Sequence, residues 1–324
     1  MRVLVTGASG FIGAHTARAL ALAGHDLRLL ARPTSDLSAL TDLDYALATG
    51  DLSGDGVADA VNSIDAVVHV AGIVAARTDA DFHRVNARGT GLLAAAAADA
   101  GVRRFLLVSS LAARGPSRDG TPPDADGRRQ PVTPYGESKA AAEVEALGRA
   151  GEMAVQILRP PAVYGPGDMA LLPFFKMARR HFITRLGDGR NQTAMIYGPD
   201  CAQAIVALLE REPGSRSTFH ISDRTGPYDW RQLIEALAIA YGHRIVSIPV
   251  PAMAFALGAH LSVAFSRLRH NTPLLDYSRV AEMRQPAWLS DHGALTEHTG
   301  WTPQTDLTDG LRLTLDWYRD HGWV

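Results

Sequence analysis

The chain has 324 residues, of which 46% are hydrophobic and 20% charged, the composition of an ordinary globular protein. Its net charge of −2 at pH 7 argues against nucleic acid or an anionic membrane as a partner, because polyanion binding needs a strongly basic face. The single cysteine, Cys201, excludes an intramolecular disulfide and a cysteine-based metal site, and no His-x-x-x-His pair indicates another, so we expect no metal and a cytoplasmic location.

The first half of the chain alternates strand and helix patterns. Short apolar runs are typical of buried parallel strands, and they occur at 3–5, 27–31, 66–70, 105–108 and 155–158. Helical patterns lie between them, at 11–23, 81–100 and 134–150. This alternation predicts right-handed crossovers and a doubly wound parallel sheet, which is an α/β fold. Because Met1-Arg2 leads straight into the first strand and a glycine-rich turn, we expect no signal peptide.

After about Gly165 the pattern changes. Prolines and glycines cluster at 159–161 and 165–167, and helical patterns then dominate, at 171–180, 199–210, 230–241, 251–268 and 307–321. We therefore expect one domain over 1–165, to which segments near 192–221 return, including a strand at 218–221. A smaller, mostly helical substrate lobe over 166–324 should cover the sheet's carboxyl edge. The most apolar later stretch, 251–265, contains a histidine and is too short to span a bilayer, so we expect no transmembrane segment.

A glycine-rich turn follows the first predicted strand. Gly7, Gly10 and Gly13 have the spacing G-x-x-G-x-x-G, in which one glycine permits a tight turn, one lets backbone N–H groups approach a pyrophosphate, and one lets helix and strand pack closely. The helix beginning near Phe11 directs its positive end at the phosphates. Asp51 follows the third strand pattern, and the run Val70-Ala71-Gly72 follows the fourth. The arrangement predicts a dinucleotide site; a ligand-free structural turn is the alternative.

The end of the second predicted strand bears on which dinucleotide is bound. An acidic residue there would accept hydrogen bonds from the adenosine ribose and repel a 2′-phosphate. This chain has Ala31 at that place and Arg32 after it, and a guanidinium is well suited to a phosphate. We therefore favour NADP over NAD. Two readings keep NAD open: Arg32 stacks on adenine, or the nearby Asp36 reaches a ribose.

A tyrosine and a lysine stand one helical turn apart after the fifth predicted strand. Thr133 suits an N-cap and Pro134 a first helical residue, which puts Tyr135 and Lys139 on one helix face. A tyrosine hydroxyl has a pKa of about 10, so it stays protonated at neutral pH and cannot act as a base there. An ammonium about 4 Å away would favour the phenolate by up to ~4 kcal/mol at an effective dielectric of about 20, which would lower that pKa into the useful range.

Y-x-x-x-K alone is common by chance, but here Ser109-Ser110 ends the strand just upstream, where a hydroxyl can bind the substrate's oxygen. These residues together resemble the extended short-chain dehydrogenase/reductase family, whose fold is a Rossmann-type sheet, and the likeness covers nearly the whole chain. Its patterns T-G-x-x-G-F-I-G, G-D-L, H-x-A, V-N and R-P-x-x-V-Y-G-P-G match residues 6–13, 50–52, 69–71, 85–86 and 159–167.

The resemblance implies roles for individual residues. Tyr135 is the acid/base, Lys139 tunes it and holds the nicotinamide ribose, and Ser110, five residues before Gly115, polarises the reacting oxygen. Together with the glycine turn, it implies that NAD(P) contacts Gly7, Gly10, Phe11, Ile12, Gly13, Arg32, Asp51, Leu52, Val70, Ala71, Gly72, Asn86, Ser109, Tyr135, Lys139, Pro160 and Val163.

Two departures from the family's patterns narrow the prediction. Sugar dehydratases carry an Asp-Glu pair directly after the catalytic hydroxyl residue, and here Leu111-Ala112 stands there, so dehydration is not expected. The family's His-Val-Asp-Asp run reads Tyr197-Gly198-Pro199-Asp200, of which we expect only a helix-capping role of Asp200 to survive.

Three functions remain open. The first is interconversion of a secondary alcohol and a ketone on a fairly apolar substrate, as in the branch with 3β-hydroxysteroid dehydrogenases and dihydroflavonol reductases, which the apolar residues of 249–265 (Met253, Phe255, Leu257, Leu261 and Phe265) favour. These residues equally fit an ordinary lobe core. The second is a nucleotide-sugar epimerase with the same tyrosine, and the third a non-catalytic dinucleotide-binding protein. The resemblance also implies a homodimer.

Overall fold

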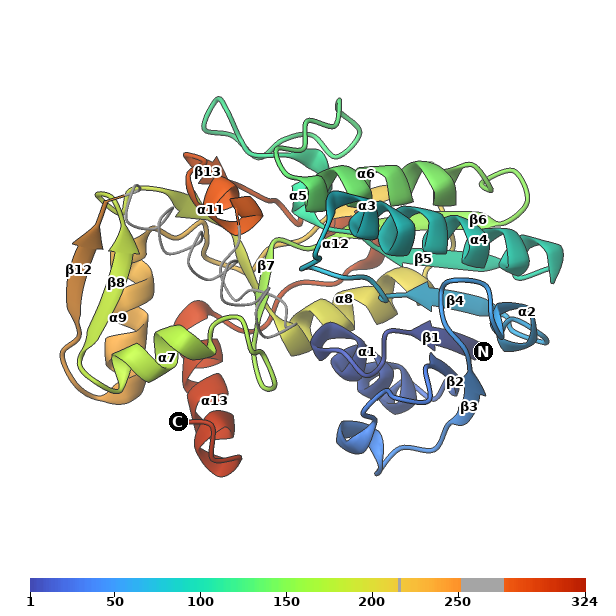
Figure 1. Ribbon diagram of the computed structural model, residues 1–324, viewed down its shortest axis with the longest axis horizontal. Helices are drawn as coiled ribbons and strands as arrows, with labels where there is room; N and C mark the ends of the chain where they lie inside the picture. The colour runs from blue at the N-terminus through green and yellow to red at the C-terminus, as the bar shows by residue number, and fades with distance from the viewer. Residues whose placement is uncertain (215–216, 252–276) are drawn as a thin grey trace.

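The computed structural model describes residues 1–214, 217–251 and 277–324 (Figure 1). Its centre is a seven-stranded parallel sheet with the strand order β11-β6-β5-β4-β1-β2-β3. The strands are β1 (Arg2–Thr6), β2 (Asp26–Ala31), β3 (Ala46–Thr49), β4 (Ala66–His69), β5 (Arg104–Val108), β6 (Ala154–Arg159) and β11 (Thr218–His220). The predicted α/β doubly wound fold is confirmed, and each predicted strand of the first half is present within two residues of its expected bounds.

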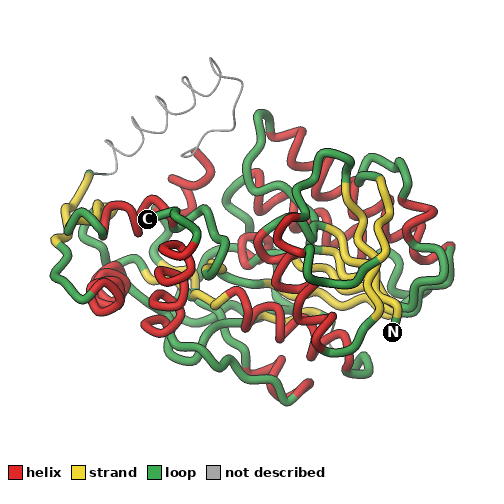
Figure 2. Tube along the Cα trace, turned by 90° about the horizontal axis from the view of Figure 1, so that it is seen from below, coloured by secondary structure: helices red, strands yellow, loops and turns green. Residues whose placement is uncertain are grey.

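Helices cover both faces of this sheet because its side chains alternate between two cores. Val3 and Val5 pack with α1 (Phe11–Leu22), α8 (Gly198–Glu210) and α12 (Gly293–Thr299) on one face. Leu4 packs with α2 (Val57–Ala60), α4 (Gly89–Asp99) and α6 (Pro134–Leu147) on the other. Figure 2 shows the strands side by side in the part of the molecule that holds the N-terminus, with helices around them.

The helix predicted over 81–100 is interrupted. It consists of α3 (Asp79–Phe82), a π-helical turn at His83–Arg88 and then α4. Such turns insert one residue into a helix and are frequent at functional sites, and this one carries Asn86. Two short helices complete this half, a 3₁₀ turn at Ser38–Leu40 and α5 (Leu111–Arg114).

The remaining described residues form a lobe beside the sheet, on the left in Figure 1. Its helices are α7 (Leu172–Ala178), α9 (Trp230–Tyr241), α11 (Tyr277–Met283) and α13 (Leu307–Asp320). It also has parallel strand pairs, which the helical expectation missed, formed by β7 (Ala162–Tyr164) with β10 (Met195–Tyr197), β8 (Phe182–Leu186) with β12 (Val246–Val250), and β9 (Gln192–Thr193) with β13 (Ala287–Trp288). These strands are too short and mixed in polarity to show a period of two.

The helix expected over 251–268 and its apolar side chains lie outside the described residues, apart from Pro251. Two later segments lie against the main sheet: β11 pairs with β6, and α12 packs beside β11. The domain limits at 165 and 192–221 stay a prediction. In the described part of the chain no helix is both long and apolar enough to cross a membrane.

Candidate active site

The glycine turn between β1 and α1 has no room for side chains at two of its positions. Gly7 has a φ of 76°, and a Cβ there would lie 2.6 Å from the backbone nitrogen of Ala71. A Cβ on Gly13 would lie 2.0 Å from the carbonyl oxygen of Gly7. Gly10, the N-cap of α1, has no side chain with which to cap the first N–H groups of that helix. A cradle of this shape fits a pyrophosphate, since it brings free N–H groups and a positive helix end to one point.

The adenosine end of the predicted site lies where β2 and β3 end side by side. Arg32 is exposed, and its backbone N–H donates to the Ser35 hydroxyl at 3.2 Å. The Asp51 carboxylate accepts from the Ser53 hydroxyl at 2.5 Å and from its N–H at 2.7 Å. These bonds, with a smaller contribution from the Arg32 charge, lower the pKa of Asp51. The structure thus brings a guanidinium and an ionised carboxylate together where a ribose or its phosphate is expected, while Leu52 packs against Gly89.

The loop after β4 is supported by His69, the last residue of that strand, which is fully buried. Its Nδ1 lies 2.7 Å from the Thr6 hydroxyl and its Nε2 lies 2.9 Å from the Thr90 hydroxyl. Because the Thr90 hydroxyl donates its own proton to the Asn86 carbonyl, Nε2 of His69 must be the donor in its bond to Thr90. Burial, together with the charge of Lys139, lowers the pKa of His69 to about 3. Thr6 also accepts from the Ala71 N–H at 3.2 Å, which positions the loop.

Asn86 fixes the same loop from the side. Its Oδ1 accepts from the Ile73 N–H at 2.8 Å, and its Nδ2 donates to the Ile73 carbonyl at 3.0 Å and to the Ser138 hydroxyl at 2.9 Å. The buried amide therefore ties the loop to α6. Its expected contact with the cofactor stays a prediction. A Cβ on Gly72 would lie 3.8 Å from the Nζ of Lys139, so the Lys139 ammonium lies against this loop.

The helix α6, which carries Tyr135 and Lys139, begins as expected. Thr133 is its N-cap and accepts from the Gly136 N–H at 3.1 Å, and Pro134 stands in the first turn. Ser110 ends the segment after β5, caps α5, and its hydroxyl is hydrogen-bonded to that of Tyr135. The Tyr135 ring is held edge-on by Phe82, with 6.0 Å between the ring centroids. The structure thus brings the two predicted hydroxyls together, at the carboxyl end of the sheet.

The expected lowering of the Tyr135 pKa by Lys139 is wrong for this structure. Burial raises the pKa of Tyr135 to about 12, and the Glu282 carboxylate of α11 adds to this, while the bond from Ser110 opposes it. The ammonium of Lys139 instead donates to the Val108 carbonyl at 2.9 Å. Burial lowers the pKa of Lys139 to about 8, against the opposing charge of Glu143. Tyr135 is therefore a protonated hydroxyl at neutral pH, suited to donating a proton.

Several predicted contacts have a clear place in the structure. The Ser109 hydroxyl faces away from Tyr135, donating to Glu143 Oε1 at 2.6 Å. Pro160 is buried, and its carbonyl accepts from the Leu111 N–H at 2.8 Å. Val163 lies in β7, opposite Ile196. Phe11 contacts His15 edge-on and would touch a Cβ on Gly198, so the start of α1 meets the start of α8.

The expected capping role of Asp200 is also wrong. Its carboxylate accepts the N–H groups of Gln304, at 3.0 Å, and Thr305, at 2.8 Å. Asp200 lies in the first turn of α8, but Tyr197 is the N-cap, and the side chain turns outward to the segment that leads into α13. Through these two bonds Asp200 joins α8 to the segment before α13, the last helix of the lobe.

Sequence reasoning missed four residues that shape the site, namely His69 as a buried support, Glu143, Arg159 and Glu282. Glu143 stands four residues after Lys139, and this helical spacing was the one available signal for it. Glu282 Oε1 accepts from the Thr133 hydroxyl at 3.0 Å across 149 positions, which no local pattern can indicate. Among the described residues no group of three His, Cys, Asp or Glu side chains is placed to hold a metal ion.

Comparisons with known proteins agree with this geometry. The model of the NAD dependent epimerase/dehydratase family matches residues 3–221. Ceramide reductase from Caulobacter vibrioides is 35% identical over 99% of this chain and 96% of its own length. Sterol demethylase protein B from Methylococcus capsulatus is 35% identical over 100% of both chains. The crystal structure of gox2253 superposes with a TM-score of 0.82 at 25% identity, covering 99% of each chain.

Proposed function

Because this chain belongs to the NAD dependent epimerase/dehydratase family, as an extended short-chain dehydrogenase/reductase, we propose that it interconverts a ketone and a secondary alcohol on a lipophilic substrate. The observation that carries this proposal is the hydrogen-bonded pair of Ser110 and Tyr135, with Lys139 one helical turn further on, at the edge that also bears the glycine cradle. When bound, the nicotinamide supplies or accepts the hydride.

The protein's own groups would manage the proton. Tyr135, kept protonated by its surroundings, gives its proton to the substrate oxygen as negative charge develops there, and Ser110 donates a second hydrogen bond to the same oxygen. An alkoxide is a far stronger base than a phenolate, so a high Tyr135 pKa does not prevent this transfer. The place of Lys139 beside the loop at Gly72 suits a ribose hydroxyl of the cofactor. A protonated Tyr135 is the proton donor that reduction of a ketone needs.

The substrate class rests on the relatives and on what the site lacks. Ceramide and sterol, in the names of the two relatives reported above, are both lipids. Leu111 and Ala112 are buried apolar residues at the place where elimination chemistry would need an acid and a base. Arg32, exposed beside Asp51 at the adenosine end, supports NADP as the preferred cofactor.

Turnover tests the proposal. A panel of long-chain ketones, sterols, flavonoids and small ketones is assayed with NADPH and NADH, alongside UDP- and GDP-sugars. We expect oxidation of NADPH with a lipophilic ketone, and Tyr135→Phe should lower kcat by about 10²- to 10⁴-fold with little change in cofactor affinity. Tyr45→Phe, a partly buried tyrosine of the sheet domain, serves as the control and should keep full activity.

Two outcomes would replace the proposal. Conversion of a nucleotide sugar with no net change in NAD(P)H, by a protein that retains its cofactor on purification, would assign an epimerase. Cofactor binding without turnover of any compound, and a cellular phenotype that Tyr135→Phe leaves intact, would assign a non-catalytic dinucleotide-binding protein.

A further inference from the structure

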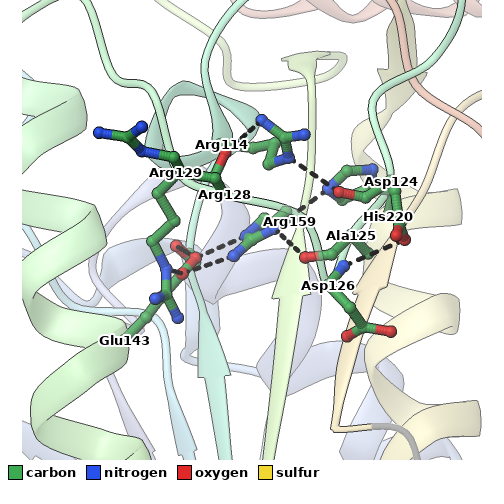
Figure 3. A network of polar contacts seen from close by, with 10 residues as sticks. Arg114, Asp124, Ala125, Asp126, Arg128, Arg129, Glu143, Arg159 and His220 are labelled. Atoms are coloured by element: carbon green, nitrogen blue, oxygen red, sulfur yellow. Dashed lines mark hydrogen bonds and ion pairs between the residues drawn. The ribbon is translucent and has the colours of Figure 1, made fainter.

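Behind the catalytic hydroxyls lies a carboxylate that the reaction scheme does not use. Glu143 of α6 is fully buried, and each of its oxygens accepts two hydrogen bonds (Figure 3). Oε1 accepts from Ser109 at 2.6 Å and from Arg159 Nε at 2.7 Å, and Oε2 accepts from Arg159 Nη2 and from Arg129 Nε, each at 2.7 Å. The carboxylate is thus saturated with donors, which with its two arginines keeps its pKa low despite burial.

Its main partner, Arg159, is 1% exposed and reaches further. Arg159 Nη1 donates to the Ala125 carbonyl at 2.8 Å and lies 3.4 Å from His220 Nε2. Arg114 holds the same segment, donating to the carbonyls of Asp124 at 2.8 Å and Arg128 at 2.6 Å. The long loop that joins α5, which Ser110 caps, to α6, which carries Tyr135, is therefore fastened to one buried ion pair (Figure 3).

Glu143 also touches both elements that carry the catalytic groups. It stands one turn after Lys139 and two turns after Tyr135 on the same helix. It also accepts a hydrogen bond from Ser109, the residue directly before Ser110. A buried ion pair is a poor source of stability, because the desolvation of both charges offsets much of their attraction, so its place directly behind the proposed catalytic site points to another role.

We propose, building on the function proposed above, that Glu143 is a positioning residue: its carboxylate holds the Ser109-Ser110 turn against α6 and keeps the Lys139 ammonium charged, while Arg159 holds Glu143 in place. Lys139 is 5% exposed, and burial alone would favour its neutral form. The charge of Glu143 acts in the opposite direction and keeps the pKa of Lys139 at about 8.

The other groups that face this lysine do not replace Glu143. His69 of β4, which is neutral, faces this lysine, and Tyr135, one turn earlier on α6, is protonated. The guanidinium groups of Arg159 and Arg129 both pair with the Glu143 carboxylate, which offsets part of their positive charge. Glu282 approaches from α11, on the Tyr135 side of the site. Loss of the Glu143 charge should therefore lower the pKa of this buried lysine, because Glu143 is the acid whose charge raises it.

The chain offers a direct test, because it has only two lysines, Lys139 and Lys176. In protein labelled with ¹³C-lysine, the two Cε signals can be followed by NMR over pH 5 to 11, with Lys176→Arg assigning them. We expect the Lys139 midpoint near 8 in the parent protein, and at least about one pH unit lower in Glu143→Gln. Glu145→Gln, an exposed glutamate two residues on, should leave it unmoved.

The same shift should appear in catalysis. With the lipophilic ketone and NADPH, kcat of the parent protein should fall as the pH rises through about 8, and kcat of Glu143→Gln should fall at least about one pH unit earlier. For a midpoint one pH unit lower we expect a roughly 3-fold loss at pH 7.5 that is largely recovered at pH 6. An unmoved NMR midpoint, or a loss of kcat that is equal at every pH, would overturn the proposal and leave Glu143 a purely structural residue.

A second variant separates this role from folding. Glu143→Gln leaves Arg159 without its full counter-charge, which destabilises the protein, whereas Glu143→Leu with Arg159→Met removes both charges and should recover much of that stability. The proposal expects the double variant to keep the lowered Lys139 midpoint. A midpoint restored to that of the parent would contradict it. The NMR titration needs no substrate, so it tests the role of Glu143 even if no ketone is turned over. Absence of ketone turnover would count against the proposed function alone.

Discussion

At Tyr135, burial and hydrogen bonding act in opposite directions on one hydroxyl. Desolvation and the Glu282 charge raise its pKa to about 12, and the bond from Ser110 pulls it down. A simple Coulomb argument from helical spacing omits the first of these, because the distance from Tyr135 to Lys139 says nothing about how much water surrounds either group. The ammonium of Lys139, one helical turn further on, donates to the Val108 carbonyl instead.

Arg32 leads to a prediction at the scale of one residue. Arg32→Ala should lower kcat/KM with NADPH by about 10- to 100-fold, since a charge-assisted hydrogen bond to a phosphate contributes about 1.5–3 kcal/mol. The value with NADH should change less than about threefold. Steady-state kinetics with both cofactors measures this, and Arg103→Ala, an exposed arginine at the opposite edge of the sheet, is the control. Equal losses with NADPH and NADH would rule out recognition of a 2′-phosphate.

Among the elements, α1 and α6 carry the site for different reasons. The helix α1 approaches β1 so closely that its third residue, Gly13, lies against the carbonyl of Gly7. The helix α6 has a threonine cap at its start and buries its small residues Ala142 and Ala146 against α4 and the sheet. Its outer face leaves Val144 58% exposed, and the homodimer that the resemblance implies stays a prediction.

Gly13→Ala tests the close packing of α1. The added Cβ would lie 2.0 Å from a backbone oxygen, so α1 must move away from the turn. We expect a loss of about 1–3 kcal/mol in the free energy of unfolding and at least a 10-fold weaker affinity for NADPH. Urea unfolding and fluorescence titration measure the two effects. At Gly151 a Cβ would meet no atom within 4 Å, so Gly151→Ala should change neither, and a Gly13→Ala protein that binds normally would refute the cradle.

At the scale of the whole molecule, His69 and His220 are buried among the described residues and stay neutral. Burial lowers the pKa of His69 to about 3 and that of His220 to about 4, where Arg159 adds to the effect. Since both values lie below that of an unfolded histidine, about 6.5, only the unfolded chain takes up these protons as the pH falls. Their contribution to stability is therefore complete above pH 6.5 and is lost progressively below it.

This linkage predicts acid instability. Between pH 7 and pH 5 each histidine should lower the free energy of unfolding by about 2 kcal/mol, or about 4 kcal/mol together. Urea unfolding at several pH values measures the slope. His220→Asn should remove about half of it, while replacement of the exposed His321 by alanine should leave it unchanged. A stability that stays constant from pH 7 to pH 5 would show that these rings are hydrated or paired with acids in solution.

The amino-acid sequence by itself determined the features that depend on neighbours along the chain. The glycine turn, the Thr133 cap, the Tyr135–Lys139 spacing and the alternation of strands with helices each follow from a few adjacent residues, because steric limits and helical periodicity act locally. The fold class and the expected grouping of the catalytic hydroxyls came from these signals, and so did the family resemblance.

Only the tertiary structure decided which buried groups face one another. Glu143 meets Arg159 through the packing of α6 against β6, Glu282 reaches Thr133 from the lobe, and Asp200 holds residues 304–305 instead of capping its own helix. The ionisation of Tyr135, Lys139 and His69 belongs to the same class. Solvation and electrostatic fields depend on every neighbour in space, and contacts between distant segments leave no periodic trace in a single sequence.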